Sequence, residues 1–318
     1  MFGVSHPGSV AVDDLAARLD AALKDVYRIE GELGGGTASR LFLAVERALD
    51  RRVVIKVLSP DAASEVGAVR FKREISLAAH LQHPHILPVL SAGARGDLLY
   101  YVMPYLEGES LRHRLQAEGR LPIEDCLTIL RDVADALAFA HAAGFVHRDV
   151  KPGNILLQGG HAVLTDFGVA RALEEARGGR RLTDPGTAVG TPGYMSPEQA
   201  VGEAEVDARS DVYALAIVGY EMVAGAPPFR GPTVQAVVAA HLAQTPKPLR
   251  ELRADVPGAL ADAVSRALAK DPADRYQTAA AFRDALPSPA GARPHGRRSG
   301  LRALAAGLAA LAGFHRAK

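Results

Sequence analysis

The hydrophobic pattern of the chain changes near residue 108, and this change limits the fold more than any other feature. Before it, short apolar runs bounded by turn residues predict strands at Tyr27–Leu33, Leu41–Glu46, Val53–Leu58, Leu87–Leu90 and Leu98–Tyr105. One stretch, residues 64–82, has helical spacing instead. Beyond Gly108 helical patterns dominate. We therefore expect an α+β protein with two lobes, a small mostly-β N-lobe with one main helix and a larger mostly-α C-lobe.

The second part of the chain contains six predicted helices and two short predicted strands. The helices are Leu111–Gln116, Ile123–Gly144, Val206–Ala224, Thr233–Gln244, Ala259–Ala269 and Thr278–Leu286. The strands are Ile155–Leu157 and Ala162–Thr165. A cleft between two lobes is a common place for a nucleotide.

The two ends of the chain lie outside this pattern. Residues 1–26 contain an amphipathic helical repeat but no unbroken apolar run, so we expect a lead-in helix and no secretory signal. Residues 287–318 begin with a linker rich in proline and arginine. The apolar run Ala303–Phe314 that follows is shorter than the roughly 20 residues that span a bilayer. We expect a terminal helix or an interfacial segment there, with a marginal membrane anchor as the alternative.

Charge and cysteine content exclude some classes of function. The formal net charge of +1 argues against a general nucleic-acid binder, which would need a basic excess. Cys126 is the single cysteine, so the chain cannot form an internal disulfide. This usage fits a reducing interior, and we expect a cytoplasmic protein, with the inner face of the membrane as the variant that the C-terminal segment leaves open.

Two features of the predicted β region suggest phosphate binding. Lys56 stands inside the apolar strand Val53–Leu58, and a buried ammonium group needs an anionic partner, either a phosphate or a carboxylate such as Glu74. The run Gly34–Gly36 would let backbone N–H groups approach phosphate oxygens. Each feature has a plainer alternative, an edge-strand lysine with a solvated head and an ordinary glycine-rich hairpin.

The strongest functional signal is the octet HRDVKPGN at residues 147–154, followed by DFG at residues 166–168. Asp149 can accept a proton from an attacking hydroxyl group. Lys151 can neutralise charge on a phosphoryl group, and Asn154 and Asp166 offer the hard oxygen ligands that Mg²⁺ takes. A base next to two metal ligands suits in-line phosphoryl transfer.

In this order, the motifs resemble those of the eukaryotic-type protein kinases, most closely the bacterial serine/threonine kinases, over residues 27–286. The resemblance implies a bilobal kinase fold with an N-lobe at 27–105 and a C-lobe at 106–286. It also implies transfer of the γ-phosphoryl group of Mg-ATP to serine or threonine hydroxyls of protein substrates, with Mn²⁺ as a substitute cation. Relatives can dimerise through the N-lobe, so a homodimer is a further expectation by analogy.

The resemblance assigns roles to individual residues. Lys56 would pair with Glu74 and grip the α- and β-phosphates, Asp149 would be the catalytic base beside Lys151, and Asn154 and Asp166 would hold the metal ion. The residues implied around ATP are Leu33, Gly34, Gly35, Gly36, Thr37, Ala38, Ser39, Leu41, Val54, Lys56, Met103, Pro104, Tyr105, Leu106 and Leu156, with Met103 as gatekeeper and residues 104–106 as hinge. Ser39 replaces the third glycine of the loop, and Val54 replaces a more usual alanine.

The resemblance also implies a structural brace and a regulatory segment. Glu198 should pair with Arg275, and Asp211 should hold the catalytic loop. Thr183 and Thr187 lie in the long polar segment between Gly168 and Ser196, and we expect autophosphorylation at one or both to activate the enzyme, with Arg148 receiving the phosphate. The alternative is a solvated loop without a regulatory role.

Two other functions remain to be weighed. A pseudokinase or nucleotide-binding signalling scaffold would keep the fold but lack the base, a metal ligand or the strand lysine, and the sequence contains all of these. A small-molecule phosphotransferase would usually lack the long threonine-bearing segment and the pair of Glu198 with Arg275.

Overall fold

The structure is a computed structural model, and it describes residues 10–35, 39–58, 71, 75, 76, 78–167, 192–203 and 206–288, with side chains from residue 15 onward. Contacts divide the chain into a unit of residues 1–287 and a second unit of residues 288–318, of which only Ser288 is described. Several residues named above therefore lie outside the described ones: Gly36, Thr37, Ala38, Glu74, Gly168, Thr183, Thr187 and the C-terminal apolar segment.

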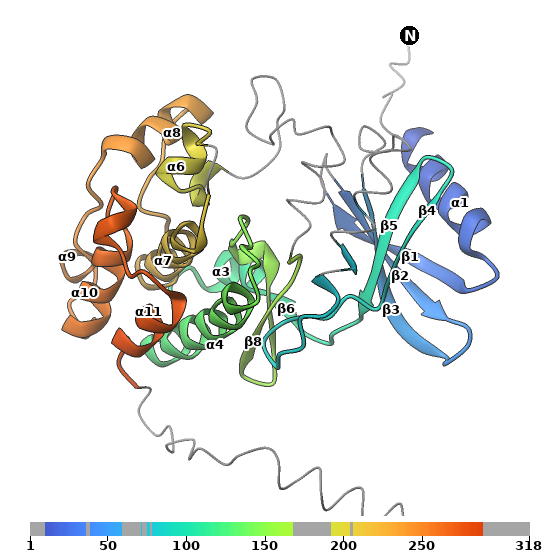
Figure 1. The fold of residues 1–318 in the computed structure, drawn as a ribbon, viewed down its shortest axis with the longest axis horizontal. Helices are drawn as coiled ribbons and strands as arrows, with labels where there is room; N and C mark the ends of the chain where they lie inside the picture. Colours follow the sequence, from blue (N-terminus) through green and yellow to red (C-terminus); the bar gives the residue numbers. More distant parts are fainter. Residues whose placement is uncertain are drawn as a thin grey trace, which may run out of the picture. The chain divides into compact units, whose positions relative to one another are not determined.

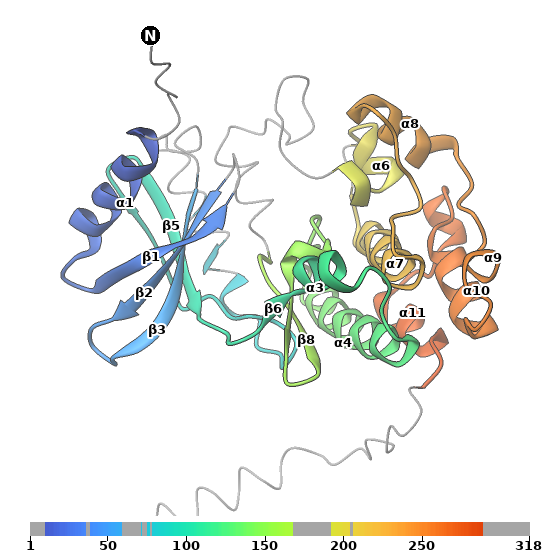
Figure 2. The same cartoon turned by 180° about the vertical axis from the view of Figure 1, so that it is seen from behind.

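The N-terminal part of the larger unit is an antiparallel sheet of five strands in the order β1-β2-β3-β5-β4 (Figure 1). The strands are β1 (Tyr27–Gly35), β2 (Ser39–Glu46), β3 (Arg51–Leu58), β4 (Ser91–Arg95) and β5 (Leu98–Pro104). Helix α1 (Val10–Leu23) lies against this sheet, as Figures 1 and 2 both show. The α+β fold class is thereby confirmed for this part of the chain.

Both faces of the sheet are covered, because side chains of β3 alternate between two apolar clusters. Val53, Ile55 and Val57 pack with Leu19 and Leu23 of α1. On the opposite face, Val54 and Leu58 pack in a second cluster that includes Phe71, Ile75, Leu99 and Met103. Lys56 belongs by its register to this second face, between two apolar neighbours. The strand lysine predicted from the sequence is therefore largely buried, and its side chain is 14% exposed.

One predicted strand is wrong. The run Leu87–Leu90 is not a strand; the edge strand β4 begins only at Ser91. Leu87 is buried in the cluster of the second face, and its N–H group donates to the carbonyl of Leu164. An apolar run of four residues can be buried by packing alone, and periodicity does not distinguish this case from a strand. The predicted strands at 27–33 and 41–46 extend further than expected, to Gly35 and from Ser39.

The C-terminal part is mostly helical (Figure 2). Its helices are α3 (Leu111–Glu118), α4 (Ile123–Ala142), α6 (Pro197–Ala200), α7 (Ala208–Ala224), α8 (Val234–Ala243), α9 (Leu249–Leu252), α10 (Gly258–Ala267) and α11 (Ala279–Ala285), with the 3-10 turns η2 (Pro152–Asn154), η3 (Pro192–Tyr194) and η4 (Pro272–Asp274). A small sheet, β6 (Glu109–Ser110), β7 (Ile155–Gln158) and β8 (His161–Leu164), precedes the DFG motif. The six predicted helices and both short strands agree with these elements within a few residues.

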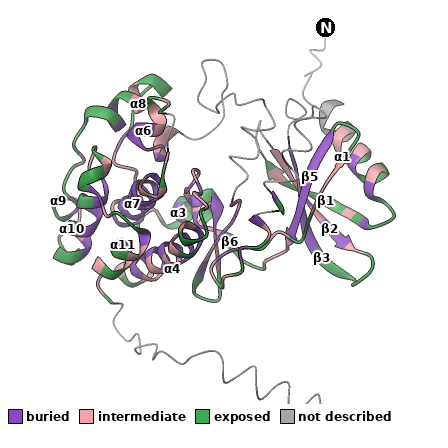
Figure 3. Cartoon of the chain, in the orientation of Figure 1, coloured by how far each residue is buried: buried purple, intermediate pink, exposed green. Residues whose placement is uncertain are grey.

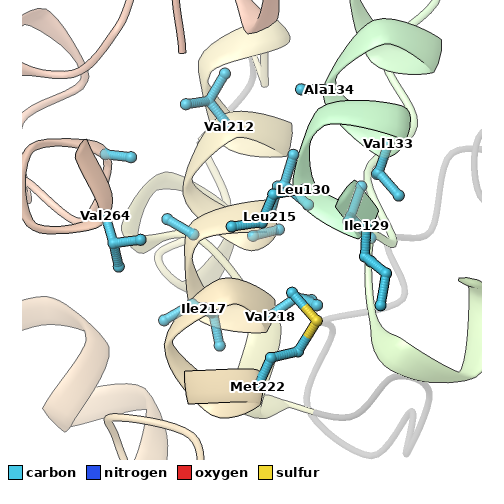
Figure 4. Close-up of a cluster of buried hydrophobic side chains, with 14 of the residues drawn as sticks. Ile129, Leu130, Val133, Ala134, Val212, Leu215, Ile217, Val218, Met222 and Val264 are labelled. Carbon is cyan, nitrogen blue, oxygen red and sulfur yellow. The ribbon is translucent and has the colours of Figure 1, made fainter. Parts of the chain in front are cut away.

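The core of the helical part lies between α4 and α7. Every residue of α7 from Ser210 to Val223 is buried, and α7 is largely purple in Figure 3. Figure 4 shows Leu130 of α4 beside Leu215 of α7, with Val264 of α10 on the other side of α7. Because α7 is surrounded, its first turn lies inside the protein, and the polar residues Ser210 and Asp211 of that turn need internal partners.

Among the helices that the structure describes, none is both long enough and apolar enough to cross a membrane.

Candidate active site

Lys56 and Tyr101 face each other across the pairing of β3 with β5. Directly opposed residues of antiparallel strands point to the same face, so the sheet itself places the two side chains together. The Lys56 ammonium lies 2.6 Å from Oδ2 of Asp166, and the Tyr101 hydroxyl donates to Oδ1 of the same carboxylate. Both oxygens of Asp166 are thus bound from the sheet.

The environment of Asp166 favours its ionised form. Burial opposes ionisation, but the Lys56 ammonium and the Tyr101 hydroxyl outweigh it and hold the pKa of the carboxyl below its ordinary value. Burial is also the main cause that raises the pKa of Tyr101, so this hydroxyl stays a donor at neutral pH. The backbone of Asp166 has a φ of 67°, an uncommon conformation for an aspartate, and the side-chain contacts help to offset its strain.

Hydrogen bonds connect the segment before Asp166 to the catalytic loop. The N–H of Thr165 donates to the carbonyl of Asn154 over 2.9 Å. The carbonyl of Thr165 accepts from Nε2 of His147 over 2.8 Å, and Nδ1 of the same ring accepts from the N–H of Asp149. The buried His147 ring, bonded through both nitrogens, joins the two motifs as a fixed spacer.

Asp149, Lys151 and Asn154 form the centre of the catalytic loop. Nζ of Lys151 lies 2.7 and 3.0 Å from the two carboxylate oxygens of Asp149. Nδ2 of Asn154 donates to the carbonyl of Asp149 over 2.8 Å and to its Oδ2 over 3.0 Å. Since both donor positions of the Asn154 amide are turned to Asp149, its Oδ1 is left as an acceptor. That oxygen and the Asp166 carboxylate are both oxygen donors of the kind that a hard divalent cation prefers.

Asp211, in the first turn of α7, holds the start of this loop. Its carboxylate accepts from the backbone N–H groups of His147 (2.7 Å) and Arg148 (2.8 Å) and from Nε2 of His141 (2.7 Å). Arg148 has a φ of 67°, and Gln199 donates to its carbonyl. A carboxylate that is only 1% exposed therefore fixes the strained backbone of Arg148, the residue just before Asp149.

Apolar residues expected around a nucleotide gather in one cluster. Val54 and Met103 are buried in it, and Leu41, Leu106 and Leu156 pack against it. Leu33, at the end of β1, is instead 51% exposed. Gly35 lies so close to the returning strand that a Cβ atom there would be 2.5 Å from the carbonyl oxygen of Ser39. A glycine is required at this position by the close approach of the two backbones.

The brace expected from the sequence forms as a buried, two-pronged ion pair. Glu198 and Arg275 are joined by contacts of 2.7 and 2.9 Å, and Ser210 also donates to Glu198. The remaining N–H groups of the fully buried Arg275 donate to the carbonyls of Arg209, Ala269 and Lys270. Burial opposes ionisation of Glu198, yet the hydrogen bonds that Glu198 accepts from Arg275 and Ser210 hold its pKa below the ordinary value. The segment beginning at Ser196 is thus tied to α7 and to the C-terminal helices.

The comparison with known families is decisive once this geometry is known. The sequence profile of the protein kinase domain matches residues 27–286. The chain belongs to the protein kinase family. Among curated relatives, serine/threonine-protein kinase PknB of Mycolicibacterium smegmatis is 43% identical over 267 residues, covering 82% of this chain and 42% of its own length. PknB of Mycobacterium tuberculosis is 40% identical with the same coverage, and PknA of that organism is 38% identical over 288 residues, or 88% of this chain and 65% of PknA.

The chain thus spans less than half the length of the PknB kinases that it resembles. Membership of the family is shown by the shared domain, and protein kinases as a family use ATP and a divalent metal and act on proteins. The bilobal kinase fold predicted from the sequence is confirmed.

The structure brings five of the six predicted catalytic and metal-binding residues into one bonded network. Asp149, Lys151 and Asn154 are joined directly, and Thr165 connects Asn154 to Asp166 and so to Lys56. The expected partner of Lys56, Glu74, lies outside the described residues, and the observed partner is Asp166. The expected gatekeeper Met103 and the first hinge residue, Pro104, lie at the end of β5, paired with Val54 and Val53 respectively.

Tyr101 was missed by the sequence analysis. It looks like one more apolar residue of a buried strand, and only the register of β5 against β3 shows that it lies opposite Lys56. The signal for Tyr101 is a hydroxyl group directly opposite the unusual strand lysine, and it can be recognised only once the pairing of β3 with β5 is known.

The buried pair predicts a pH-dependent stability. Glu198→Gln removes a charge opposite Arg275, and losing one partner of a buried pair costs about 3–5 kcal/mol. Because the pKa of Glu198 is lowered, its stabilising contribution is present above its ordinary pKa of 4.5 and is lost as pH falls through its lower value in the folded protein. Denaturant unfolding from pH 7 downward should therefore show the difference between wild type and variant shrinking in acid.

The matched control is Glu251→Gln, which alters an exposed glutamate 4.0 Å from Lys247. This control should change the free energy of unfolding by less than about 1 kcal/mol at every pH. A Glu198→Gln effect that is equally small, or constant between pH 7 and pH 3, would contradict the account.

Proposed function

We propose that this protein is an ATP-dependent serine/threonine protein kinase that transfers the γ-phosphoryl group of ATP to hydroxyl groups of protein substrates. The observation that carries the proposal is the connected set of side chains around Asp149. A carboxylate base, a lysine in contact with it, an asparagine whose amide nitrogen holds the base, and a second carboxylate paired to a strand lysine form one network. Each of these groups has a use in phosphoryl transfer.

In the proposed reaction, the substrate hydroxyl attacks the γ-phosphorus of ATP and its proton passes to Asp149. A bond forms between the hydroxyl oxygen and phosphorus while the bond from phosphorus to the β-phosphate oxygen breaks, which releases ADP. Asp149 is 39% exposed, so a hydroxyl can reach it, and its contacts with Lys151 and Asn154 orient it. Lys151 is placed to balance negative charge that builds up near the base.

The cation that supports this reaction is proposed to be Mg²⁺, with Mn²⁺ able to replace it. Asp166 and Oδ1 of Asn154 would hold it, because both are oxygen donors and Mg²⁺ prefers such ligands. A bound divalent cation would neutralise charge on the phosphate oxygens. Lys56 keeps Asp166 ionised, which is the state that a metal ligand requires.

The acceptor class is supported by the relatives and by the segment around Glu198. Relatives that share the domain carry the name serine/threonine-protein kinase. Tyr194 is buried in this segment, where its hydroxyl contacts Arg112 and Glu221. This anchor and the pair of Glu198 with Arg275 would hold the platform on which a protein substrate lies, a feature that a small-molecule phosphotransferase does not need. A pseudokinase would have to lack one of the groups in the network, and the described residues supply Lys56, Asp149, Asn154 and Asp166.

Regulation and location stay predictions from the sequence. Autophosphorylation at Thr183 or Thr187 is proposed as the activating step, and these residues lie outside the described part of the chain. A cytoplasmic location, contact of the C-terminal segment with a membrane and dimerisation through the N-lobe are proposals of the same standing.

Removing the base tests the proposal directly. Asp149→Asn should lower the rate of phosphoryl transfer to a generic basic protein by about 10²–10⁴-fold, because the amide cannot accept the proton. ATP binding should change by no more than a few-fold, since Asp149 belongs to the acceptor side of the network. Transfer of labelled phosphate and nucleotide binding by calorimetry measure the two effects. Asp262→Asn, at an exposed position of α10, is the matched control and should keep full activity. Comparable activity of both variants would exclude Asp149 as the base.

Tyr101 should set the acidic limit of activity. Tyr101→Phe removes the hydroxyl that donates to Asp166, so the pKa of Asp166 should rise and the acidic limb of the profile of kcat/KM against pH should move to higher pH. Tyr100→Phe is the matched control, because Tyr100 packs on the opposite face of the sheet with the α1 cluster. An unchanged acidic limb in Tyr101→Phe, or an equal shift in both variants, would contradict the role given to the hydroxyl.

A further inference from the structure

Three side chains outside the proposed reaction meet at a junction of three segments. His85 comes from the segment after Ala78, Asp132 from α4 and His161 from the start of β8. One ligand atom from each lies within 4.8 Å of the other two. We propose that His85, Asp132 and His161 bind a divalent transition-metal ion, best matched by Zn²⁺. This inference does not depend on the proposed kinase activity.

The hydrogen bond of His85 to Ala162 leaves its other ring nitrogen, Nε2, facing Asp132. Its Nδ1 lies 2.8 Å from the carbonyl oxygen of Ala162, so in the neutral ring Nδ1 carries the hydrogen. Its Nε2 then presents a lone pair, and this atom lies 3.5 Å from Oδ1 of Asp132. In the neutral ring these two atoms are both acceptors, and a metal ion between them would satisfy both. A histidine whose second nitrogen donates to a backbone carbonyl is also the usual arrangement of a metal ligand.

Asp132 is held so that one of its oxygens remains available. Its Oδ2 accepts from the backbone N–H of Ala162 over 3.0 Å and lies 3.2 Å from Nδ1 of His161. Its side chain is only 14% exposed, which limits the hydration of the carboxylate. The Oδ1 atom that faces His85 therefore carries negative charge with little hydration, and a positive charge beside it would stabilise it.

A tight turn fixes the position of His161. β7 and β8 are joined by Gly159 and Gly160, both with positive φ (58° and 83°), as a two-residue hairpin turn requires. His161 is the first residue after this turn, and its side chain is 66% exposed. Its ring can therefore give Nδ1 to a metal ion while the other ring nitrogen remains in water. The same exposure gives the ion a path into the site.

The ligand atoms lie within reach of one metal ion, because one atom from each residue lies within 4.8 Å of the other two. Zinc bonds of about 2.0–2.1 Å to imidazole and carboxylate place neighbouring ligand atoms about 3.3 Å apart in a tetrahedron. The two measured separations of this size involve different oxygens of Asp132: Nε2 of His85 lies 3.5 Å from Oδ1, and Nδ1 of His161 lies 3.2 Å from Oδ2. Two imidazoles and one carboxylate suit Zn²⁺ and similar ions better than Mg²⁺ or Ca²⁺, and water can complete the fourth position.

A metal ion bound to His85, Asp132 and His161 would connect α4 to β8, the strand that leads to the proposed active site. Next to His85, Ile86 forms a β-bridge with Leu164, and the N–H of Leu164 donates to the carbonyl of His85 itself. Leu164 is the last residue of β8 and precedes Asp166 by two residues. A cation shared by the three segments would therefore stabilise the approach of β8 to the DFG motif without touching the reacting groups.

The experiment measures binding of Zn²⁺ to the full chain without a histidine tag. Chelator-stripped protein is dialysed against Zn²⁺ in excess Mg²⁺, which occupies sites for hard cations, and bound zinc is counted. Wild type should bind one more Zn²⁺ per chain than His161→Ala, or bind it at least tenfold more tightly. Co²⁺ used as a probe should give the visible spectrum of a tetrahedral site with imidazole ligands in wild type alone. Zn²⁺ should also raise the Tm of wild type and leave that of His161→Ala unchanged.

His113→Ala is the matched control, because His113 is exposed and also contacts a carboxylate, that of Glu109, over 2.7 Å. It should bind Zn²⁺ as wild type does. The substituted His161 is exposed, so His161→Ala should remain folded, and circular dichroism checks this. Asp132→Asn serves as a second variant that removes the central charge. Equal Zn²⁺ binding by wild type and His161→Ala, no Zn²⁺ binding by wild type, or equal losses in His161→Ala and His113→Ala would each overturn the proposal.

Discussion

A half-buried ion pair between Lys56 and Asp166 joins the β-sheet to the segment that carries the catalytic groups. The lysine is held in an apolar strand with buried neighbours on both sides, and the aspartate has a strained backbone. Neither group would be stable there alone, because an unpaired charge in such surroundings is costly. Their pairing therefore keeps both in place, and the Tyr101 hydroxyl donates a hydrogen bond to the second oxygen of the Asp166 carboxylate. In the proposed function, Lys56 would also contact the phosphates of ATP, and Asp166 would also bind the metal ion.

Two further buried carboxylates organise the loop around this pair. Asp211 fixes the backbone before Asp149, and Glu198 ties the segment after residue 192 to Arg275. Both act at the first turn of α7, because Asp211 belongs to it and Glu198 accepts a hydrogen bond from Ser210 of the same turn. The core thus serves the site in a specific way. It holds the start of α7 in place, so that Asp211 in the first turn can fix the backbone of the catalytic loop at His147 and Arg148.

The sequence was sufficient where functional residues are close together in the chain. The octet at 147–154 and the DFG motif identified Asp149, Asn154 and Asp166, and helical periodicity located α4 and α7, because local spacing carries both kinds of information. It was insufficient where contacts depend on strand register or on distant segments. Tyr101 required the pairing of β3 with β5, and the group of His85, Asp132 and His161 required three separate segments to be placed together. The run Leu87–Leu90 predicts a strand wrongly, because burial by packing and burial in a sheet have the same apolar signature.

The central claim is that Asp166, paired with Lys56, is a ligand for the cation that accompanies ATP. It is tested most directly by measuring ATP affinity by calorimetry with and without Mg²⁺, in wild type and in Asp166→Asn. The account predicts that Mg²⁺ strengthens ATP binding by wild type and that this gain is lost in the variant, while ATP affinity without metal is reduced little. An equal gain from Mg²⁺ in both proteins would contradict it, because the cation would then be held without Asp166.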